Sequence, residues 1–338
     1  MDTTPARYVE FESLLRPDQV DQLIGIVQGH APYPTYGEGR KQEGFGAGIP
    51  QRYDAARNFV RTRAGGDNVA RLASRTNYFR DTFAYEQPLF AQITFFQQLP
   101  QFIEAAHHVT GKRLIRPAIV YLNILVPGQE LAVHTDVPEF RGANRTFAPE
   151  WLLVAMHHSG RFARWRRTIA TGVSWYHDCN GGEFTYYPNG PGEPPRRLAV
   201  RRNTAIVLDT DSVFHGVEAV ASAGAELPMV EPGVRLHRDD DGWWSIRRDG
   251  LVRARYAWND LRLSISWKAW CFADADEQRL NEDHRDDLTL EQILAIFVED
   301  LRERGRVDRR PDDDTLAHLI LDEYIKFPQQ NLEGESHA

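Results

Sequence analysis

The sequence predicts a mainly β domain whose core is flanked by helices at both ends of the chain. Residues from about 115 to 272 contain many short runs of β-forming residues separated by turn signals. The segments before and after this region carry apolar residues at helical spacing. A chain of 338 residues with 42% hydrophobic residues is long enough to bury a full core. Many short antiparallel strands are typical of a β-sandwich or a barrel.

Composition and charge exclude several classes of protein. The 48 acidic side chains outnumber the 40 basic ones, and the net charge of −8 argues against a general nucleic-acid binder. The two cysteines, Cys179 and Cys271, are too few for a disulfide scaffold or a cysteine-rich zinc module. The N-terminus lacks a signal-peptide pattern, and no apolar run is long enough to span a membrane. We therefore expect a cytoplasmic protein that contacts neither membranes nor nucleic acid.

Residues 1–114 are expected to form a helix-rich region that packs on the β core. One helix is predicted by apolar residues at helical spacing, which are Val20, Leu23, Ile24 and Val27. A second is expected to begin near Pro100, which suits a first helical turn, and to end at Gly111. Residues 33–48 are rich in Gly and Pro and predict a long loop.

The β core is predicted over residues 115–272. Its expected strands cover 118–126, 131–136, 168–176, 183–187, 204–208, 213–220 and 261–270. Two segments interrupt these strands. Residues 149–158 begin with a proline and predict a helix. Residues 221–257 carry Asp-Gly turns and predict an inserted β-meander.

Residues 273–338 are expected to be helical. Thr289 and Gln292 have the spacing of a capping box, and an amphipathic apolar stripe continues from there towards Gly305. A second helix is predicted over 314–326. The stripe suits either packing on the outer face of the β core or the interface of a homodimer, and the sequence leaves both open.

The sequence contains His-x-Asp triplets in three different surroundings. The triplet at 237–239 lies in a charged turn, and the triplet at 284–286 lies among acidic residues before a helix, so both are expected to be solvated. His134-Thr-Asp136 instead ends an apolar strand. Residues i and i+2 share one face of a strand, so the side chains of His134 and Asp136 are expected to point the same way.

Two later segments can complete a site with this triplet. His215, in the apolar run 213–217, can supply a third metal ligand. Two His and one carboxylate on one face form the facial triad of a non-heme Fe(II) site, which leaves coordination positions open for a cosubstrate and O₂. Arg262 and Ser264 share one face of the final strand. An arginine there can bind a carboxylate through two parallel hydrogen bonds, and the hydroxyl can add another.

Taken in order, these motifs resemble the Fe(II)/2-oxoglutarate-dependent dioxygenases. The resemblance covers roughly residues 115–272, about half of the chain. It is carried by His134-Thr-Asp136, Gly181-Gly-Glu-Phe184, Val207-Leu-Asp209, His215-Gly-Val217 and Arg262-Leu-Ser264. It implies a double-stranded β-helix, which is a jelly roll with the N- and C-terminal helices packed outside.

The resemblance also implies roles for individual residues. His134, Asp136 and His215 would bind Fe(II), and Arg262 and Ser264 would hold the distal carboxylate of 2-oxoglutarate. Two further residues of the first core strand are candidates for contacting 2-oxoglutarate, with core packing as the alternative, and these are Tyr121 and Asn123. Halogenating relatives lack the carboxylate at the position of Asp136, so halogenation is not expected.

One feature departs from the family pattern. Family members usually place the arginine much closer to the second His than the 47 residues that separate His215 from Arg262. The meander at 221–257 accounts for this distance if it leaves the barrel and the chain then returns. If it does not, Arg235 or Arg247 would be the next candidates. Arg262 is preferred because it lies in a long alternating strand that could close the barrel.

The resemblance implies an oxidoreductase that uses Fe(II), 2-oxoglutarate and O₂ to oxidise an unactivated C–H bond. The expected substrate is a small molecule such as an amino acid or a natural-product intermediate. Hydroxylation is the expected outcome, and desaturation or ring closure are the alternatives to it. The alternatives are a protein or peptidyl hydroxylase and a non-catalytic metal-binding jelly roll. An anionic group on the substrate could be bound by the arginines of segment 141–167, which are Arg141, Arg145, Arg161, Arg164, Arg166 and Arg167.

Overall fold

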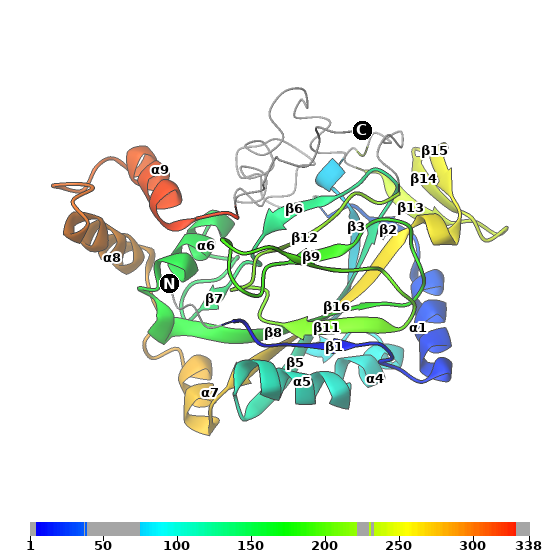
Figure 1. Cartoon of the computed structure of the whole chain (residues 1–338), viewed down its shortest axis with the longest axis horizontal. Helices are drawn as coiled ribbons and strands as arrows, with labels where there is room; N and C mark the ends of the chain where they lie inside the picture. Colours follow the sequence, from blue (N-terminus) through cyan, green and yellow to red (C-terminus); the bar gives the residue numbers. More distant parts are fainter. Residues whose placement is uncertain (1–4, 37, 39–74, 222–229, 231–232, 329–338) are drawn as a thin grey trace.

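The computed structural model describes residues 5–36, 38, 75–221, 230 and 233–328. A large sheet forms one wall of the molecule (Figure 1). Its strand order is β1-β11-β8-β16-β5-β3-β4, and β7 pairs with β8. In this order the strands are β1 (Tyr8–Phe11), β11 (Thr204–Leu208), β8 (Arg166–Trp175), β16 (Arg262–Phe272), β5 (Leu114–Leu125), β3 (Phe79–Tyr85) and β4 (Gln87–Pro88), with β7 (Glu139–Phe140) at the side.

A smaller sheet faces the large one and has the order β10-β9-β12-β6 (Figure 1). Its strands are β10 (Arg196–Leu198), β9 (Phe184–Tyr186), β12 (His215–Val217) and β6 (Leu131–His134). From β5 onward the chain passes repeatedly between the sheets, with β5, β8, β11 and β16 in the large one and β6, β9, β10 and β12 in the small one. Neighbouring strands are antiparallel. This is the arrangement of a double-sheet jelly roll.

Helices cover the outer face of the large sheet (Figure 1). The N-terminal ones are α1 (Pro17–His30), α4 (Thr94–Gln97) and α5 (Pro100–Thr110), with the 3₁₀ turn η1 (Ala91–Ile93) before α4. Phe102 of α5 packs against Trp267 of β16, with ring centroids 5.4 Å apart. The left-handed Gly111 (φ 67°) ends α5, as predicted. β1 and β3 also come from residues before 115, so this region adds strands as well as helices to the large sheet.

The later helices are α6 (Glu150–Ser159), α7 (Ala275–Glu282), α8 (Leu290–Glu303) and α9 (Asp313–Tyr324), with 3₁₀ turns η2 (Ala163–Trp165) and η3 (Trp258–Asp260). The predicted capping box is present, because Thr289 Oγ1 accepts from the backbone N–H of Gln292 at 3.2 Å. The apolar stripe of α8 packs in one cluster with α6 and α9. The structure therefore gives this stripe an intramolecular role, and the homodimer stays a prediction. The predicted fold class, a mainly β jelly roll with helices outside, is confirmed.

The inserted segment between β12 and β16 forms a separate sheet of order β15-β14-β13-β2. Its strands are β15 (Leu251–Tyr256), β14 (Trp244–Arg248), β13 (Arg235–Arg238) and β2 (Tyr33–Pro34). Trp244 is fully buried and stacks on Tyr33 with ring centroids 6.3 Å apart, which fastens the insert to the N-terminal region. After the insert, β16 enters the large sheet between β8 and β5. The meander therefore leaves the jelly roll and the chain returns to it.

The ends of several elements differ from the sequence prediction. The strand expected over 131–136 ends at His134, because the backbone N–H of Asp136 donates to the carbonyl of Thr210 at 2.8 Å instead of to a ladder partner. The strand expected over 213–220 is shortened to β12. Of the loop predicted over 33–48, most lies outside the described residues, and Tyr33–Pro34 pair with β13. Among the described helices, none has the length and apolar composition needed to cross a bilayer.

Phe102 offers a test of how α5 stabilises the large sheet. Its ring is fully buried, and a Cβ added at Gly172 of β8 would lie 3.0 Å from it. Phe102→Ala should lower the free energy of unfolding by about 3–5 kcal/mol, because it removes a large buried side chain and leaves a cavity. Phe102→Leu should lower it much less. Urea unfolding measures both, and equal effects of the two substitutions would contradict this packing.

Candidate metal centre and its cavity

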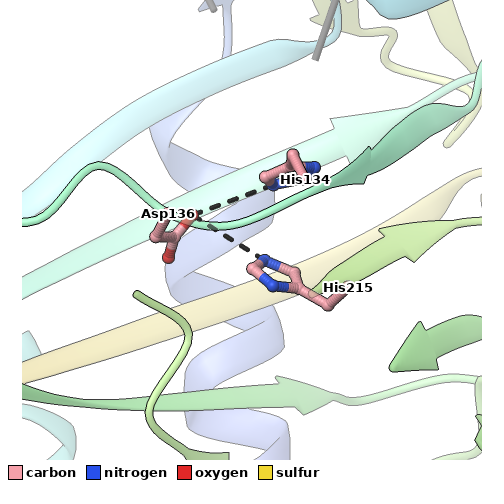
Figure 2. A group of neighbouring side chains, drawn as sticks. All are labelled: His134, Asp136 and His215. Carbon is pink, nitrogen blue, oxygen red and sulfur yellow. Dashed lines mark ion pairs between the residues drawn. The ribbon is translucent and has the colours of Figure 1, made fainter. Parts of the chain in front are cut away.

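Three predicted ligands converge at one end of the small sheet. His134 ends β6 and His215 begins β12, and the two lie directly opposite each other in the register of these strands. Their ring centroids are 4.4 Å apart. Asp136 follows β6, and its Oδ1 lies 3.8 Å from Nε2 of His134 and 3.7 Å from Nε2 of His215 (Figure 2). Among the described residues, no other group of His, Cys, Asp and Glu side chains is close enough to bind a metal.

Backbone carbonyls orient both imidazoles towards this point. Nδ1 of His134 lies 2.6 Å from the carbonyl of Ala132, and Nδ1 of His215 lies 2.9 Å from that of Val213. A carbonyl oxygen can only accept a hydrogen bond, so Nδ1 carries the proton in each ring. The lone pair of each ring is then on Nε2, the atom that would bind a metal ion, and the hydrogen bond at Nδ1 raises the basicity of the ligand.

The carboxylate of Asp136 is held by its other oxygen. Lys268 Nζ and the hydroxyl of Thr210 each donate to Oδ2 at 2.7 Å. Because these donors occupy Oδ2, Oδ1 is the oxygen that faces the two imidazoles. A metal ion would therefore meet two imidazole nitrogens and one carboxylate oxygen on one side, with positions open on the other. This donor set fits Fe(II).

A cavity of about 940 Å³ lies next to the three ligands, between the two sheets. The inner face of β16 lines it with four polar side chains, which are Arg262, Ser264, Ser266 and Lys268. β5 contributes Tyr121 and Asn123 to the same wall. All four residues expected to contact 2-oxoglutarate thus share one cavity with the candidate metal ligands.

Arg262 is a buried cation with spare hydrogen-bonding capacity. Its Nε donates to the carbonyl of Gly182 at 2.7 Å, and Nη1 donates to Ser264 Oγ at 3.2 Å. Its Nη2 is buried, and no described residue offers it a hydrogen-bond partner. No described carboxylate forms an ion pair with this guanidinium, and burial lowers its pKa to about 10. A buried charge without a counter-ion is costly, so the geometry fits an anionic ligand.

Neither of the other two arginines considered at the sequence level reaches the cavity. Arg235 pairs with Glu38, and Arg247 pairs with Asp239, both on the separate sheet of the insert. Arg262 is therefore the residue of these three that faces the candidate metal centre. Neither of the two other His-x-Asp triplets joins the group of metal ligands. One lies on β13, and His284 of the other lines the cavity before α8, with its Nδ1 2.8 Å from Asp287.

Most arginines of segment 141–167 stabilise the fold instead of facing the cavity. Arg141 pairs with Asp286, Arg161 with Asp300 and Arg166 with Asp209, while Arg164 lies over the ring of Trp165. Arg145 and Arg167 line the cavity. Arg145 and Arg167 are therefore the two arginines of this segment that could contact an anionic substrate.

Sequence reasoning missed three cavity residues, which are Lys268, Thr210 and Arg80. The alternation of β16 could have found Lys268, because it shares a face with Arg262 and Ser264. Nothing local singles out Thr210, which reaches Asp136 from another loop, or Arg80, which lies on β3 before the predicted core.

Comparisons with known proteins give structural similarity without sequence similarity. No family model matches the sequence, and no curated protein matches it. A solved oxidoreductase of the 2OG-Fe(II) oxygenase family from Burkholderia pseudomallei is similar, with 11% identity and a TM-score of 0.41 over 78% of this chain and 84% of that one. A Pseudomonas putida prolyl-4-hydroxylase has 10% identity and a TM-score of 0.40, over 78% of this chain and 92% of the hydroxylase.

HygX from Streptomyces hygroscopicus, solved with nickel, 2-oxoglutarate and hygromycin B bound, has 9% identity and a TM-score of 0.40, over 82% of this chain and 91% of that one. At such low identity and TM-score, inference about function rests on the site residues themselves.

Gly182 provides a test of how Arg262 is positioned. The φ of Gly182 is +67°, and a Cβ added there would lie 2.8 Å from Cδ of Arg262. Gly182→Ala should weaken the binding of 2-oxoglutarate roughly tenfold, because it displaces the guanidinium and strains the backbone. Calorimetric titration of the Mn(II)-loaded protein measures the affinity. Gly305→Ala is the control, since its φ is also +67° and its Cβ would meet nothing within 4 Å. Equal effects would contradict a specific contact with Arg262.

Thr210 tests the support of the metal carboxylate. Thr210→Val keeps the shape of the side chain but removes the donor to Asp136 Oδ2, and should weaken Co(II) binding about tenfold. Competition with a chelating dye measures this affinity. Thr185→Val is the matched control, because Thr185 is a buried hydroxyl that donates to Glu218 at 2.7 Å outside the centre. If both variants bind Co(II) like the wild type, Thr210 does not orient the ligand.

Proposed function

We propose that this protein is an Fe(II)- and 2-oxoglutarate-dependent oxygenase that oxidises an unactivated C–H bond of a small molecule. The observation that carries the proposal is the buried Arg262, which keeps an unpartnered Nη2 in the same cavity as His134, Asp136 and His215. A protein that only held a metal would have no use for this uncompensated cation. Hydroxylation is the expected outcome of the reaction.

Different residues of the chain would bind the metal ion and the cosubstrate. His134, Asp136 and His215 would hold Fe(II) through Nε2, Oδ1 and Nε2. The metal with its 2-oxoglutarate would supply the activation of O₂ and the oxidation of the C–H bond. Arg262 and Ser264 would bind the distal carboxylate of 2-oxoglutarate from the floor of the cavity.

Two neighbouring side chains on β5 would complete the cosubstrate pocket. Asn123 pairs with Ser264 across the strands, and its buried Oδ1 has no partner among the described residues. Tyr121 pairs with Ser266 in the same way and lines the same wall. Their position supports a contact with 2-oxoglutarate over the alternative of core packing, because both face the cavity.

The cavity favours a small-molecule substrate over a protein or peptide. Its volume of about 940 Å³ lies within the range of sites for small organic ligands. Its described lining comes from both sheets, including β3 of the large sheet, and from the segment before α6. The candidate metal centre is therefore enclosed from several sides.

An anaerobic titration with Fe(II) and then 2-oxoglutarate tests the proposal without knowledge of the substrate. A visible metal-to-ligand charge-transfer band should appear in the wild type and be absent in His215→Ala. In Arg262→Gln, the 2-oxoglutarate concentration needed for half of the band should rise roughly tenfold or more, because a charge-assisted hydrogen bond is lost.

Arg247→Gln is the matched control for this titration, since Arg247 is paired with Asp239 on the separate sheet. It should leave the band unchanged. A folded wild type that gives no band would overturn the oxygenase proposal and leave the metal-binding jelly roll as the better account.

A further inference from the structure

A second group of cations lines the cavity beyond the residues assigned to 2-oxoglutarate. Arg80 on β3 lies opposite Asn123 on β5, which lies opposite Ser264 on β16. Neighbouring strands are about 4.8 Å apart, so the backbone of Arg80 lies roughly 10 Å across the sheet from that of Ser264. The backbone of Arg80 therefore lies apart from that of Ser264, which belongs to the proposed cosubstrate pocket.

Aromatic rings hold Arg80 without using its hydrogen-bond donors. Its guanidinium carbon lies 3.8 Å from the ring centroid of Tyr121 and 5.1 Å from that of Tyr36. Tyr36 in turn stacks on Tyr78, with centroids 5.0 Å apart. Among the described residues, Arg80 has no ion pair and no hydrogen bond. Stacking fixes the plane of a guanidinium but leaves its N–H groups available.

Arg145 lines the same cavity as Arg80 and the candidate metal ligands. Its nearest described carboxylate is Glu150, with Nη1 and Oε1 3.9 Å apart, which is too long for a hydrogen bond. Its side chain stays 34% exposed and lines the cavity. Burial works to lower the pKa of Arg145, but Glu150, Tyr36 and Asp136 outweigh it and raise the pKa. Arg145 thus stays charged in the cavity that also contains Asp136.

The other cations of this wall already have partners. Arg167 Nη1 lies 3.2 Å from Glu139, and Lys268 donates to Asp136. Arg80 and Arg145 instead line one cavity with like charges. Burial and the charge of Arg145 act to lower the pKa of Arg80, but Tyr121, Tyr78 and Tyr36 outweigh them and raise it. Two arginines with available donors that face one cavity can be bridged by one oxyanion, which accepts several charge-assisted hydrogen bonds and relieves the repulsion.

We propose that Arg80 and Arg145 form an anion subsite for the substrate, and that the substrate is a small organic acid bearing a carboxylate or phosphate group. This inference rests on the proposed oxygenase function, which it extends to a substrate class. The oxyanion binds between the two arginines and directs the rest of the molecule along Tyr121 towards the metal ligands. A neutral amide or ester of the same acid would leave both cations uncompensated and bind poorly.

Inorganic phosphate is a probe that needs no knowledge of the substrate. Calorimetric titrations at low ionic strength are made on the Arg262→Gln protein, in which the proposed cosubstrate cation is removed. This protein should still bind phosphate. Adding Arg80→Gln and Arg145→Gln should weaken the affinity by about tenfold or more. Adding Arg302→Gln and Arg310→Gln removes the same charge from two exposed positions outside the cavity, one on α8 and one in the loop before α9, and should change nothing.

Two outcomes would overturn the subsite. One is phosphate binding that is absent, or that is equal with and without Arg80 and Arg145. The other is a loss of the Fe(II)–2-oxoglutarate band in Arg80→Gln as severe as in Arg262→Gln, because Arg80 would then belong to the cosubstrate pocket. Arg80→Lys keeps the charge, so it should retain part of the phosphate affinity if Arg80→Gln is poorly folded.

A screen of paired compounds tests the substrate class. Organic acids and their neutral amides are compared for their ability to raise succinate formation, with acids expected to act and amides not. Amides that act as well as acids would contradict the proposal. If the wild type gives no charge-transfer band yet phosphate binding depends on Arg80 and Arg145, the oxygenase proposal fails while the anion subsite stands, so the two failures are distinguishable.

Discussion

The position of β16 in the middle of the large sheet determines most of the site. β8 and β5 pair with its two edges, and the side chains on both of its faces are almost all buried. One face carries Leu263, Ile265 and Trp267 into the core beneath the helices. The opposite face carries Arg262, Ser264, Ser266 and Lys268, which cannot pack in an apolar core, so they line a cavity. One strand thereby supplies both the cation proposed to bind a cosubstrate and the cation that holds the carboxylate of Asp136.

The two cations of β16 are compensated in different ways. Lys268 is neutralised by Asp136 within the protein, so the metal-ligand set is charge-balanced before any metal binds. Arg262 has only neutral partners, a carbonyl and a hydroxyl, and its burial opposes its charge. An anion that binds the folded protein and not the unfolded chain stabilises the fold by mass action. Burying Arg262 without a counter-ion therefore costs stability, which a bound anion would offset.

The sequence predicted those parts of the site that follow from local patterns. The His134-Thr-Asp136 triplet, His215 and Arg262 could be found because each lies on or beside a strand that its own alternation reveals. Their convergence depends on strand pairing, which places His215 opposite His134 although 81 residues separate them. Lys268 could have been found from the alternation of β16, whereas Thr210 and Arg80 escaped because their contacts come from segments that only the fold brings together. The arginine-rich segment misled in the other direction, since three of its six arginines pair with Asp209, Asp286 or Asp300, which are remote in sequence.

The unusual spacing between His215 and Arg262 shows why register is a better guide than sequence distance. The insert builds its own sheet, pairs with Tyr33–Pro34 and buries Trp244, so it adds residues without moving either end of the connection. Lengthening such a connection costs little chain entropy. Arg262 is placed instead by its pairing with Leu125 and by Gly182, whose carbonyl and missing Cβ leave room for the guanidinium. Two residues that are distant in sequence can thus keep a fixed geometry as long as the strands that carry them keep their partners.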